Sequence, residues 1–267
     1  MESKSLLLHN LSSQYSISNA QRLIYLFPQF YWIVSRPKAI IHTDHELHGT
    51  KMRTTTFAPN EHYHICGRGV NKNTLFLDNH DYARFLFLLL YFQSPIPLHN
   101  TFWYVNSFIK KKIFCVGTDK LKRIIKDRYI NLVSFALMPN HFHILVQNME
   151  EMVISVYMQR ILTAYSKYFN AKYNKSGHVF QGPFKVIHIK NNTQLLHISA
   201  YIHKNPTEII SEEKVDYEKY DWSSYRDYID ANRWGELLDT KIISEQFKNQ
   251  NLYKNFVTSS TAKESLF

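Results

Sequence analysis

Cysteine is scarce in this sequence, which holds only Cys66 and Cys115 among its 267 residues. Two cysteines without CxxC spacing exclude a disulfide framework and fit ordinary thiols in a reducing compartment. Long apolar runs are missing as well, because the stretches at residues 23–34 and 85–92 are shorter than the ~20 residues that span a bilayer. No charged start followed by an apolar core is seen, so we expect no signal peptide. These absences predict a cytoplasmic protein that is not inserted in a membrane.

Acidic residues are the minority among the charged ones, with 22 Asp and Glu against 32 Lys and Arg. The formal net charge of +10 and the pI near 9.4 favour a polyanionic partner such as nucleic acid. Ribosomal proteins and proteins of membrane surfaces share such a charge, so it narrows the partner class without deciding it. A hydrophobic content of 45% is typical of a globular protein rather than a disordered one.

The chain divides by sequence character into three parts. Residues 1–56 mix apolar stretches with Ser, Asn and His and show no clear periodicity. Met52 stands directly before a segment that reads like the start of an ordered domain, so we expect residues 1–56 to be a disordered extension or to lie upstream of the true start. Residues 57–230 carry the recognisable patterns and form the expected functional domain. Residues 231–267 form the expected C-terminal tail.

Hydrophobic periodicity and turn residues predict the order strand, helix, strand, strand, helix, strand, helix. Strands are expected at residues 63–66, 132–137, 142–146 and 186–190, and helices at residues 78–94, 151–173 and 194–205. Pro139 and Asn140 mark a hairpin turn, and Pro206 ends the last helix. This order predicts an α+β fold with an antiparallel central sheet covered by helices.

Two basic clusters fall in the segment that is hardest to place, residues 94–129. They comprise Lys110, Lys111, Lys112, Lys120, Lys122, Arg123, Lys126 and Arg128. The second cluster has helical spacing, which fits either a solvated helix face or a contact with the DNA backbone.

The segment Met138–Val146, MPNHFHILV, carries the strongest chemical signal. On a strand, residues two apart point to the same face, so His141 and His143 project together while Phe142 points into the opposite layer. Paired imidazoles on a rigid strand make half of a metal site. The alternative is a pair of ordinary histidines in a chain that has 14.

Tyr201 and Asn205 are four residues apart on the last expected helix and share one face. The amide oxygen of Asn205 suits a hard cation, and Tyr201 would stand beside that cation as a nucleophile. The alternative for any one of the 18 tyrosines is packing with a hydrogen bond.

Five segments in this order resemble the single-tyrosine transposases of the HUH endonuclease superfamily, and most closely the transposases associated with REP sequences. The segments are YHICGRGVNKNTLFLD, LVSFALMPNHFHILVQ, GHVFQGPFK, YIHKNP and DWSSYRDY, and they span roughly residues 57–228. The resemblance implies a ferredoxin-like HUH fold. It also implies a metal-dependent endonuclease that cleaves and rejoins single-stranded or hairpin DNA.

The resemblance assigns roles to particular residues. It implies that His141, His143 and Asn205 bind Mg²⁺ or Mn²⁺, and that Tyr201 forms a 5′-phosphotyrosine with the cut strand. Such families usually read Gln-Gly-Arg-Phe-Lys where this chain has Pro183 after Gly182. The loss of that arginine leaves open a catalytically impaired, domesticated relative that only binds DNA.

Three further residues are expected to contact DNA because they lie near the turns: Arg68, Lys72 and Lys185. Ordinary surface charge is the alternative for each of them. A hydrolase that uses the histidine pair with activated water is a weaker rival, because the chain lacks an HExxH motif. Whether the protein is a monomer or a homodimer stays open at this level.

Overall fold

The computed structural model describes residues 57–111, 114–151, 153–209 and 215–261. Its centre is a four-stranded sheet in the order β2-β3-β1-β4, in which every neighbouring pair is antiparallel. The strands are β1 (His62–Arg68), β2 (Ile130–Met138), β3 (His141–Asn148) and β4 (Lys185–Ile189). The prediction of an α+β fold with an antiparallel central sheet is confirmed, and the strand order is that of a ferredoxin-like sheet. The expected N-terminal extension at residues 1–56 lies outside the described residues.

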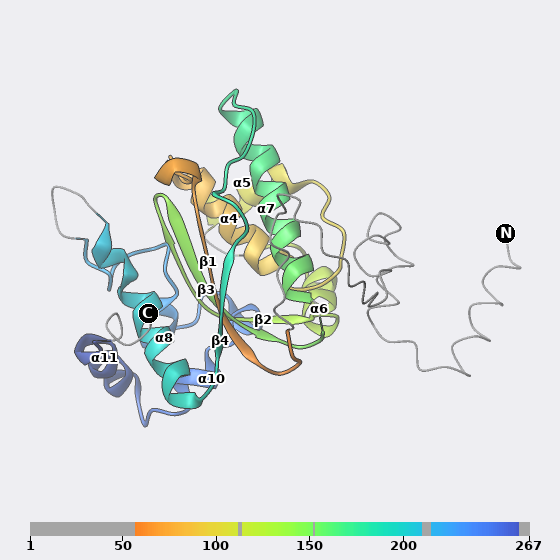
Figure 1. Cartoon of the computed structure of the whole chain (residues 1–267). Helices are drawn as coiled ribbons and strands as arrows, with labels where there is room; N and C mark the ends of the chain where they lie inside the picture. Colours follow the sequence, from red (N-terminus) through yellow and green to blue (C-terminus); the bar gives the residue numbers. More distant parts are fainter. Residues whose placement is uncertain (1–56, 112–113, 152, 210–214, 262–267) are drawn as a thin grey trace, which may run out of the picture. The chain divides into compact units, whose positions relative to one another are not determined.

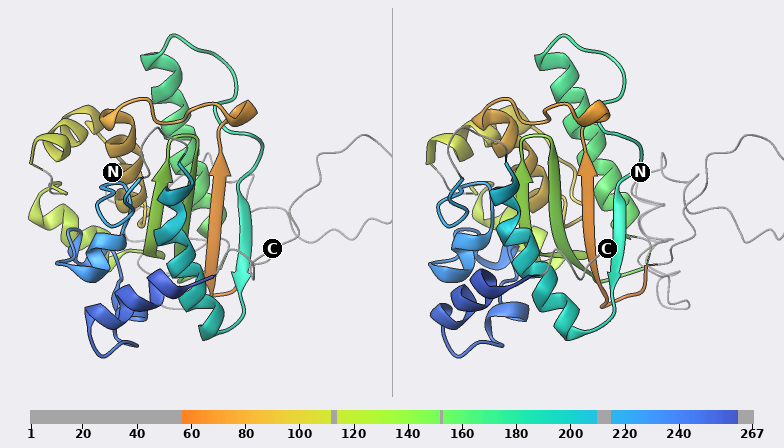
Figure 2. Two further views of the ribbon diagram at one scale, coloured as in Figure 1. Left: turned by 90° about the vertical axis from the view of Figure 1, so that its left-hand side faces the viewer. Right: turned by 60° about the vertical axis from the view of Figure 1, so that its left-hand side comes forward.

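Helices cover both faces of this sheet (Figures 1 and 2). The longer helices are α4 (Asn79–Tyr91), α5 (Thr101–Lys111), α6 (Thr118–Lys126), α7 (Val153–Lys172), α8 (Asn192–Lys204) and α11 (Gln250–Ser259). The short ones are η2 (Val70–Lys72), η3 (Asn205–Glu208), α9 (Tyr225–Ile229), η4 (Gly235–Leu237) and α10 (Lys241–Ser244). No described helix is long and apolar enough to cross a bilayer.

The alternation of side chains along the strands separates two hydrophobic cores. Phe142, Ile144 and Val146 of β3 belong to the core that includes residues of α4 and α7. Leu145 belongs to the second core, where α8 packs. Because successive residues of a strand point to opposite faces, His141 and His143 share the face of Leu145 and meet α8.

The expected hairpin joins β2 and β3, and β3 begins at His141 itself. Both histidines are therefore strand residues. Backbone hydrogen bonds fix the neighbouring end of β1, because the Gly69 amide donates to the Asn140 carbonyl at 2.9 Å and the Gln181 amide donates to the Arg68 carbonyl at 2.8 Å. The end of β1, the beginning of β3 and the segment that precedes β4 are thus held together by main-chain contacts.

Helix α8 begins where Asn191 caps it, with the Asn191 side chain accepting from the Gln194 amide at 2.8 Å. Pro206 follows the helix, and the chain continues as the tighter turn η3. A buried network fixes the C-terminal half of α8: His203 Nε2 lies 2.9 Å from Ser224 Oγ, and the Tyr253 hydroxyl lies 2.7 Å from His203 Nδ1. The placement of Tyr201 and Asn205 follows from this anchoring.

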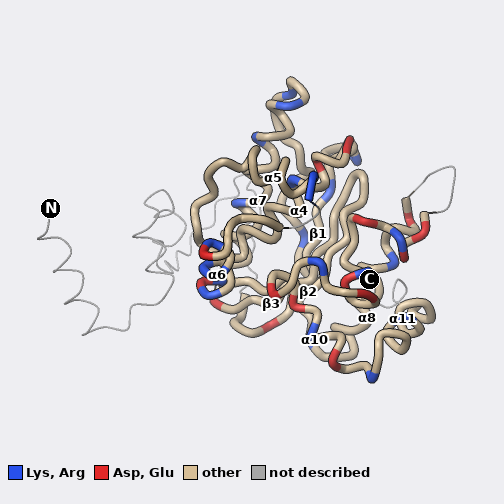
Figure 3. The backbone as a smooth tube through the Cα atoms, turned by 180° about the vertical axis from the view of Figure 1, so that it is seen from behind, with Lys and Arg blue, Asp and Glu red and all other residues tan. Residues whose placement is uncertain are grey.

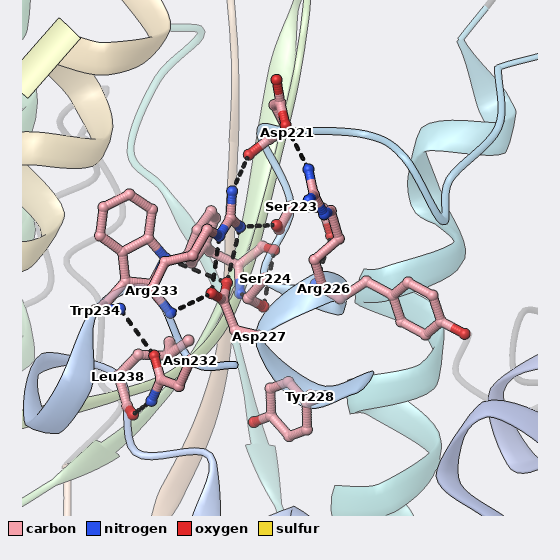
Figure 4. A network of polar contacts seen from close by, with 12 residues as sticks. Asp221, Ser223, Ser224, Arg226, Asp227, Tyr228, Asn232, Arg233, Trp234 and Leu238 are labelled. Atoms are coloured by element: carbon pink, nitrogen blue, oxygen red, sulfur yellow. Dashed lines mark hydrogen bonds and ion pairs between the residues drawn. The ribbon is translucent and has the colours of Figure 1, made fainter. Parts of the chain in front are cut away.

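An ion pair stabilises the segment that flanks β2. The guanidinium of Arg233 donates to both carboxylate oxygens of the buried Asp227, each at 2.8 Å (Figure 4). A bidentate pair of this kind is geometrically specific, so it fixes the loop between α9 and η4. Residues 231–261, expected as part of a tail, fold onto the domain through α10 and α11.

Helices α5 and α6 occupy the segment that the sequence left unassigned. Lys122, Arg123 and Lys126 of α6 are exposed, and several Lys and Arg positions lie along this helix (Figure 3). Helix α6 comes just before the first residue of β2. His141 and His143 instead pair with residues near the other end of β2, where the strand finishes. Eight steps of about 3.3 Å along β2 separate these ends by roughly 26 Å, so the cluster lies far from the histidines. A DNA contact there stays a prediction.

Candidate metal and nucleophile site

Strand register brings the expected metal pair and two expected DNA contacts onto one face. His141 lies opposite Arg68, and His143 lies opposite Cys66, which in turn pairs with Lys185 of β4. Residues that are directly paired across strands point to the same side of a sheet. The two imidazole rings stand 5.3 Å apart between centroids at an interplanar angle of 87°. One end of the sheet therefore presents two imidazoles flanked by cations.

Tyr201 reaches this end of the sheet from α8. Its ring packs edge-on against His143, with centroids 5.4 Å apart, and against His64, with centroids 6.0 Å apart. Burial raises the pKa of the Tyr201 phenol, and the negative charge of Glu208 raises it further, while a hydrogen bond with Asn205 lowers it. The phenol is therefore neutral at pH 7 and must lose its proton to act as a nucleophile.

His141 contacts two asparagines through its two ring nitrogens. Nδ1 lies 2.6 Å from Asn140 Oδ1, and Nε2 lies 3.1 Å from Asn205 Oδ1. The Asn140 amide is oriented by its own donation to the Lys72 carbonyl at 3.2 Å, so its oxygen faces the ring and accepts the Nδ1 proton. Burial lowers the pKa of His141, which keeps the ring neutral and leaves a lone pair on Nε2.

The Nε2 lone pair of His141 then faces another acceptor, the oxygen of Asn205. Two acceptors turned toward one another repel unless a proton or a cation lies between them or the amide turns its nitrogen to the ring. An imidazole nitrogen and an amide oxygen converging in this way have the chemistry of two ligands of one cation. Among the described residues no cluster of three His, Cys, Asp or Glu side chains has metal-binding geometry, so Asn205 would have to supply the third ligand.

A cavity of about 330 Å³ opens over these groups. It is lined by Cys66, Gly67, Arg68, His141, His143, Gln181, Pro183, Lys185, Tyr201 and Glu208. Of the seven site residues expected from the sequence, five line the cavity, and Asn205 adjoins it through its contact with His141. Lys72 is the exception, because it lies exposed in η2 and its carbonyl, rather than its ammonium group, contacts Asn140.

Sequence reasoning missed His64, Asn140, Gln181 and Glu208. The strand period of two places His64, Cys66 and Arg68 on one face, so a signal for His64 was present in the first strand. Glu208 follows Asn205 by three residues in a 3₁₀ turn, where side chains three apart eclipse one another. This register directs both side chains to one side of the turn.

Residues 102–205 match the model of the family described as "Transposase IS200 like". This segment contains both histidines of β3, together with Tyr201 and Asn205. Over this segment the chain is similar to the IS200-like transposases. The resemblance to insertion-sequence transposases drawn from the sequence is thereby confirmed.

A solved structure described as "Structure of the REP associates tyrosine transposase bound to a REP hairpin" is similar to this chain at 16% sequence identity. The similarity covers 72% of this chain and 94% of that one, with a TM-score of 0.44. No curated protein matches the sequence.

Proposed function

We propose that this protein cleaves and rejoins single-stranded or hairpin DNA through a 5′-phosphotyrosine on Tyr201, with Mg²⁺ or Mn²⁺ as the cofactor. The observation that supports this most directly is the packing of the Tyr201 ring against His143 in the cavity that also holds His141. The resemblance implies that Tyr201 is the nucleophile and that the two histidines are metal ligands. Tyr201 comes from α8 and the histidines come from β3, two elements far apart in the sequence. The cytoplasmic location and the homodimer stay predictions.

Each of these residues has a separate role in one phosphoryl-transfer reaction. When bound by His141, His143 and Asn205, a divalent cation would polarise the scissile phosphodiester and neutralise part of its charge. The oxygen of Tyr201 attacks phosphorus as its proton leaves, the bond from phosphorus to the 3′ oxygen breaks, and that oxygen leaves as a 3′-hydroxyl after taking up a proton. Attack by another 3′-hydroxyl on the phosphotyrosine reverses these changes and releases Tyr201. The energy of the phosphodiester is retained, so the exchange needs no nucleotide cofactor.

Arg68 and Lys185 are placed to hold the substrate. Both are exposed at the cavity that contains Tyr201, and both carry a charge that attracts a phosphate backbone. Their position on the same face as the histidines would align the strand over the phenol, and such positioning contributes much of the rate in phosphoryl transfer.

Pro183 supports a second candidate, a DNA-binding protein of the same family with impaired catalysis. It lines the cavity at the place where the resemblance implies an arginine. A proline ring offers no charge to a phosphate, so DNA would be held there by Arg68 and Lys185 without that additional cation. Binding without covalent capture of the strand is the property that distinguishes this candidate.

The deciding experiment uses labelled single-stranded DNA from the flanks of the gene, with Mg²⁺ or Mn²⁺ and a denaturing gel. We expect a protein–DNA adduct with the native chain and none with Tyr201→Phe, which should still retard the DNA in a native gel. Tyr217→Phe is the matched control, because its hydroxyl lies 3.3 Å from Thr258 and outside the cavity. Adducts that persist in Tyr201→Phe would refute the assignment, and binding without adducts in the native chain would favour the second candidate.

A further inference from the structure

A third imidazole supports the histidine pair from the neighbouring strand. His64 of β1 is 2% exposed, and its Nε2 lies 2.7 Å from Nδ1 of His143. The two rings are stacked, with centroids 5.0 Å apart and an interplanar angle of 19°. This contact is buried and joins residues 79 positions apart, so it depends on the register of β1 against β3.

The direction of this hydrogen bond decides what His143 can do. A neutral imidazole carries one proton, which leaves one nitrogen as a donor and the other as an acceptor. If His64 donated, His143 would hold its own proton on Nε2 and present an N–H to the cavity. If His143 donates from Nδ1, its Nε2 keeps a lone pair. Only the second arrangement lets His143 act as a ligand.

We infer that His64 is a positioning residue that accepts the Nδ1 proton of His143 and so turns the Nε2 lone pair of His143 toward the cavity of Tyr201. The inference rests on the proposed function, because it takes His143 to be a ligand of the cation. A hydrogen-bond acceptor that contacts the second ring nitrogen of a metal-bound histidine commonly fixes the tautomer of the ring in this way. His64 would do so here from a rigid, buried strand.

His64 also contacts the nucleophile. The edge of the Tyr201 ring packs against both His64 and His143, at interplanar angles of 79° and 86°. The three rings therefore form one packed group, in which the ring that orients the ligand also limits where the phenol lies. Packing alone does not require an imidazole at this position. The cross-strand neighbour of His64 is the apolar Leu145, and an apolar side chain in place of His64 would pack there without burying polar nitrogens.

Two substitutions separate hydrogen bonding from packing. His64→Leu removes the acceptor and keeps an apolar side chain, whereas His64→Gln keeps an oxygen that can accept from Nδ1. Isothermal titration with Mn²⁺, supported by electron paramagnetic resonance of free Mn²⁺, measures the metal affinity of the full chain without DNA. We expect His64→Leu to weaken Mn²⁺ binding by about 10- to 100-fold and His64→Gln to restore most of it.

Tyr157→Phe is the control for general damage, because it removes one buried hydrogen bond from the core on the other face of the sheet. Tyr157 of α7 is fully buried, donates to the Leu89 carbonyl at 2.8 Å and does not line the cavity. It should retain the Mn²⁺ affinity of the native chain. Equal Mn²⁺ affinity in His64→Leu and the native chain would overturn the inference.

The tautomer can be observed directly. Long-range ¹H–¹⁵N correlation spectra of the histidine rings in the metal-free native chain report which nitrogen of His143 carries the proton. We expect the proton on Nδ1, and a proton on Nε2 would overturn the inference even if the His64 variants failed to fold. If the native chain binds no Mn²⁺ but His143 carries its proton on Nδ1, the proposed metal site is refuted. The role of His64 in setting the tautomer of His143 would still be supported.

Discussion

Gly67 lies where β1 passes the ring of Phe142, and its replacement by alanine would test how the sheet holds the two histidines. A Cβ atom at this position would stand 2.6 Å from Cε1 of Phe142 and 2.7 Å from its Cζ. The Phe142 ring is fully buried and packs against Phe85, with centroids 4.9 Å apart. Because the ring has no room to retreat, relief must come from the backbone of β1 or β3. His141 and His143 flank Phe142 and would move with β3.

The expected cost follows from two opposed effects. Overpacking a filled core by one methyl group costs roughly 1–3 kcal/mol. Alanine recovers about 0.5–1 kcal/mol, because glycine loses more backbone entropy in a strand. The net destabilisation is then roughly 0–2.5 kcal/mol, with a central value of about 1.3 kcal/mol. For a domain of this size the central value corresponds to a fall of about 2.5–5 °C in the melting midpoint.

Thermal unfolding followed by circular dichroism measures this fall, and Mn²⁺ titration measures whether the histidines have moved. The variant Phe142→Leu supplies the control, because a smaller side chain leaves space for the new methyl group. Gly67→Ala should therefore cost less in the Phe142→Leu background than alone, with a coupling energy of roughly 0.5–3 kcal/mol. An unchanged or raised midpoint in Gly67→Ala, or strictly additive costs in the double variant, would refute the reasoning.

Two further predictions concern pH. Burial lowers the pKa of His203 from 6.5 to about 3, so between these values the unfolded chain binds a proton that the folded chain does not. The stability from this neutral ring is complete above pH 6.5 and falls as the pH drops, by up to about 1.4 kcal/mol per pH unit. Urea unfolding at pH 7 and pH 5 should show a smaller loss in His203→Gln than in the native chain, and equal losses would contradict the assignment. Burial and the charge of Glu208 both raise the pKa of Tyr201, so Glu208→Gln should shift the rate profile of adduct formation to lower pH. An unshifted profile would mean that the charge of Glu208 does not act on the phenol.

Local periodicity found the part of the site that is local in sequence. The strand period of two paired His141 with His143, and the helix spacing of four paired Tyr201 with Asn205. The structure brings these two pairs together, with His141 Nε2 3.1 Å from Asn205 Oδ1. Each pair could be recognised from the sequence because it lies within one element, and an element's own geometry decides which of its residues share a face.

Contacts between distant elements escaped the sequence analysis. The role of His64 depends on a bond to a residue 79 positions away, which strand period alone does not reveal. Helix α5 was missed, and α6 was indicated only by the helical spacing of the second basic cluster, because residues 94–129 combine prolines with basic clusters that gave no firm boundary. Lys72 was expected at the DNA surface from its nearness to a turn, yet it does not line the cavity, and its carbonyl rather than its ammonium group contacts Asn140.

The burial of the histidines and the proposed chemistry require the same protonation state. Burial lowers the pKa of His64 to about 4 and holds the pKa of His143 well below 6.5. Both rings are therefore neutral at pH 7, and a neutral imidazole keeps the lone pair that a cation needs. A protonated pair would repel a divalent cation, and it would do so beside Arg68, which already contributes to lowering the pKa of His143. Burying these ring nitrogens away from water costs folding free energy, but the same burial keeps the rings neutral and able to bind a cation. Apolar side chains would fill this space without that cost, so the presence of histidines here favours a functional role for them.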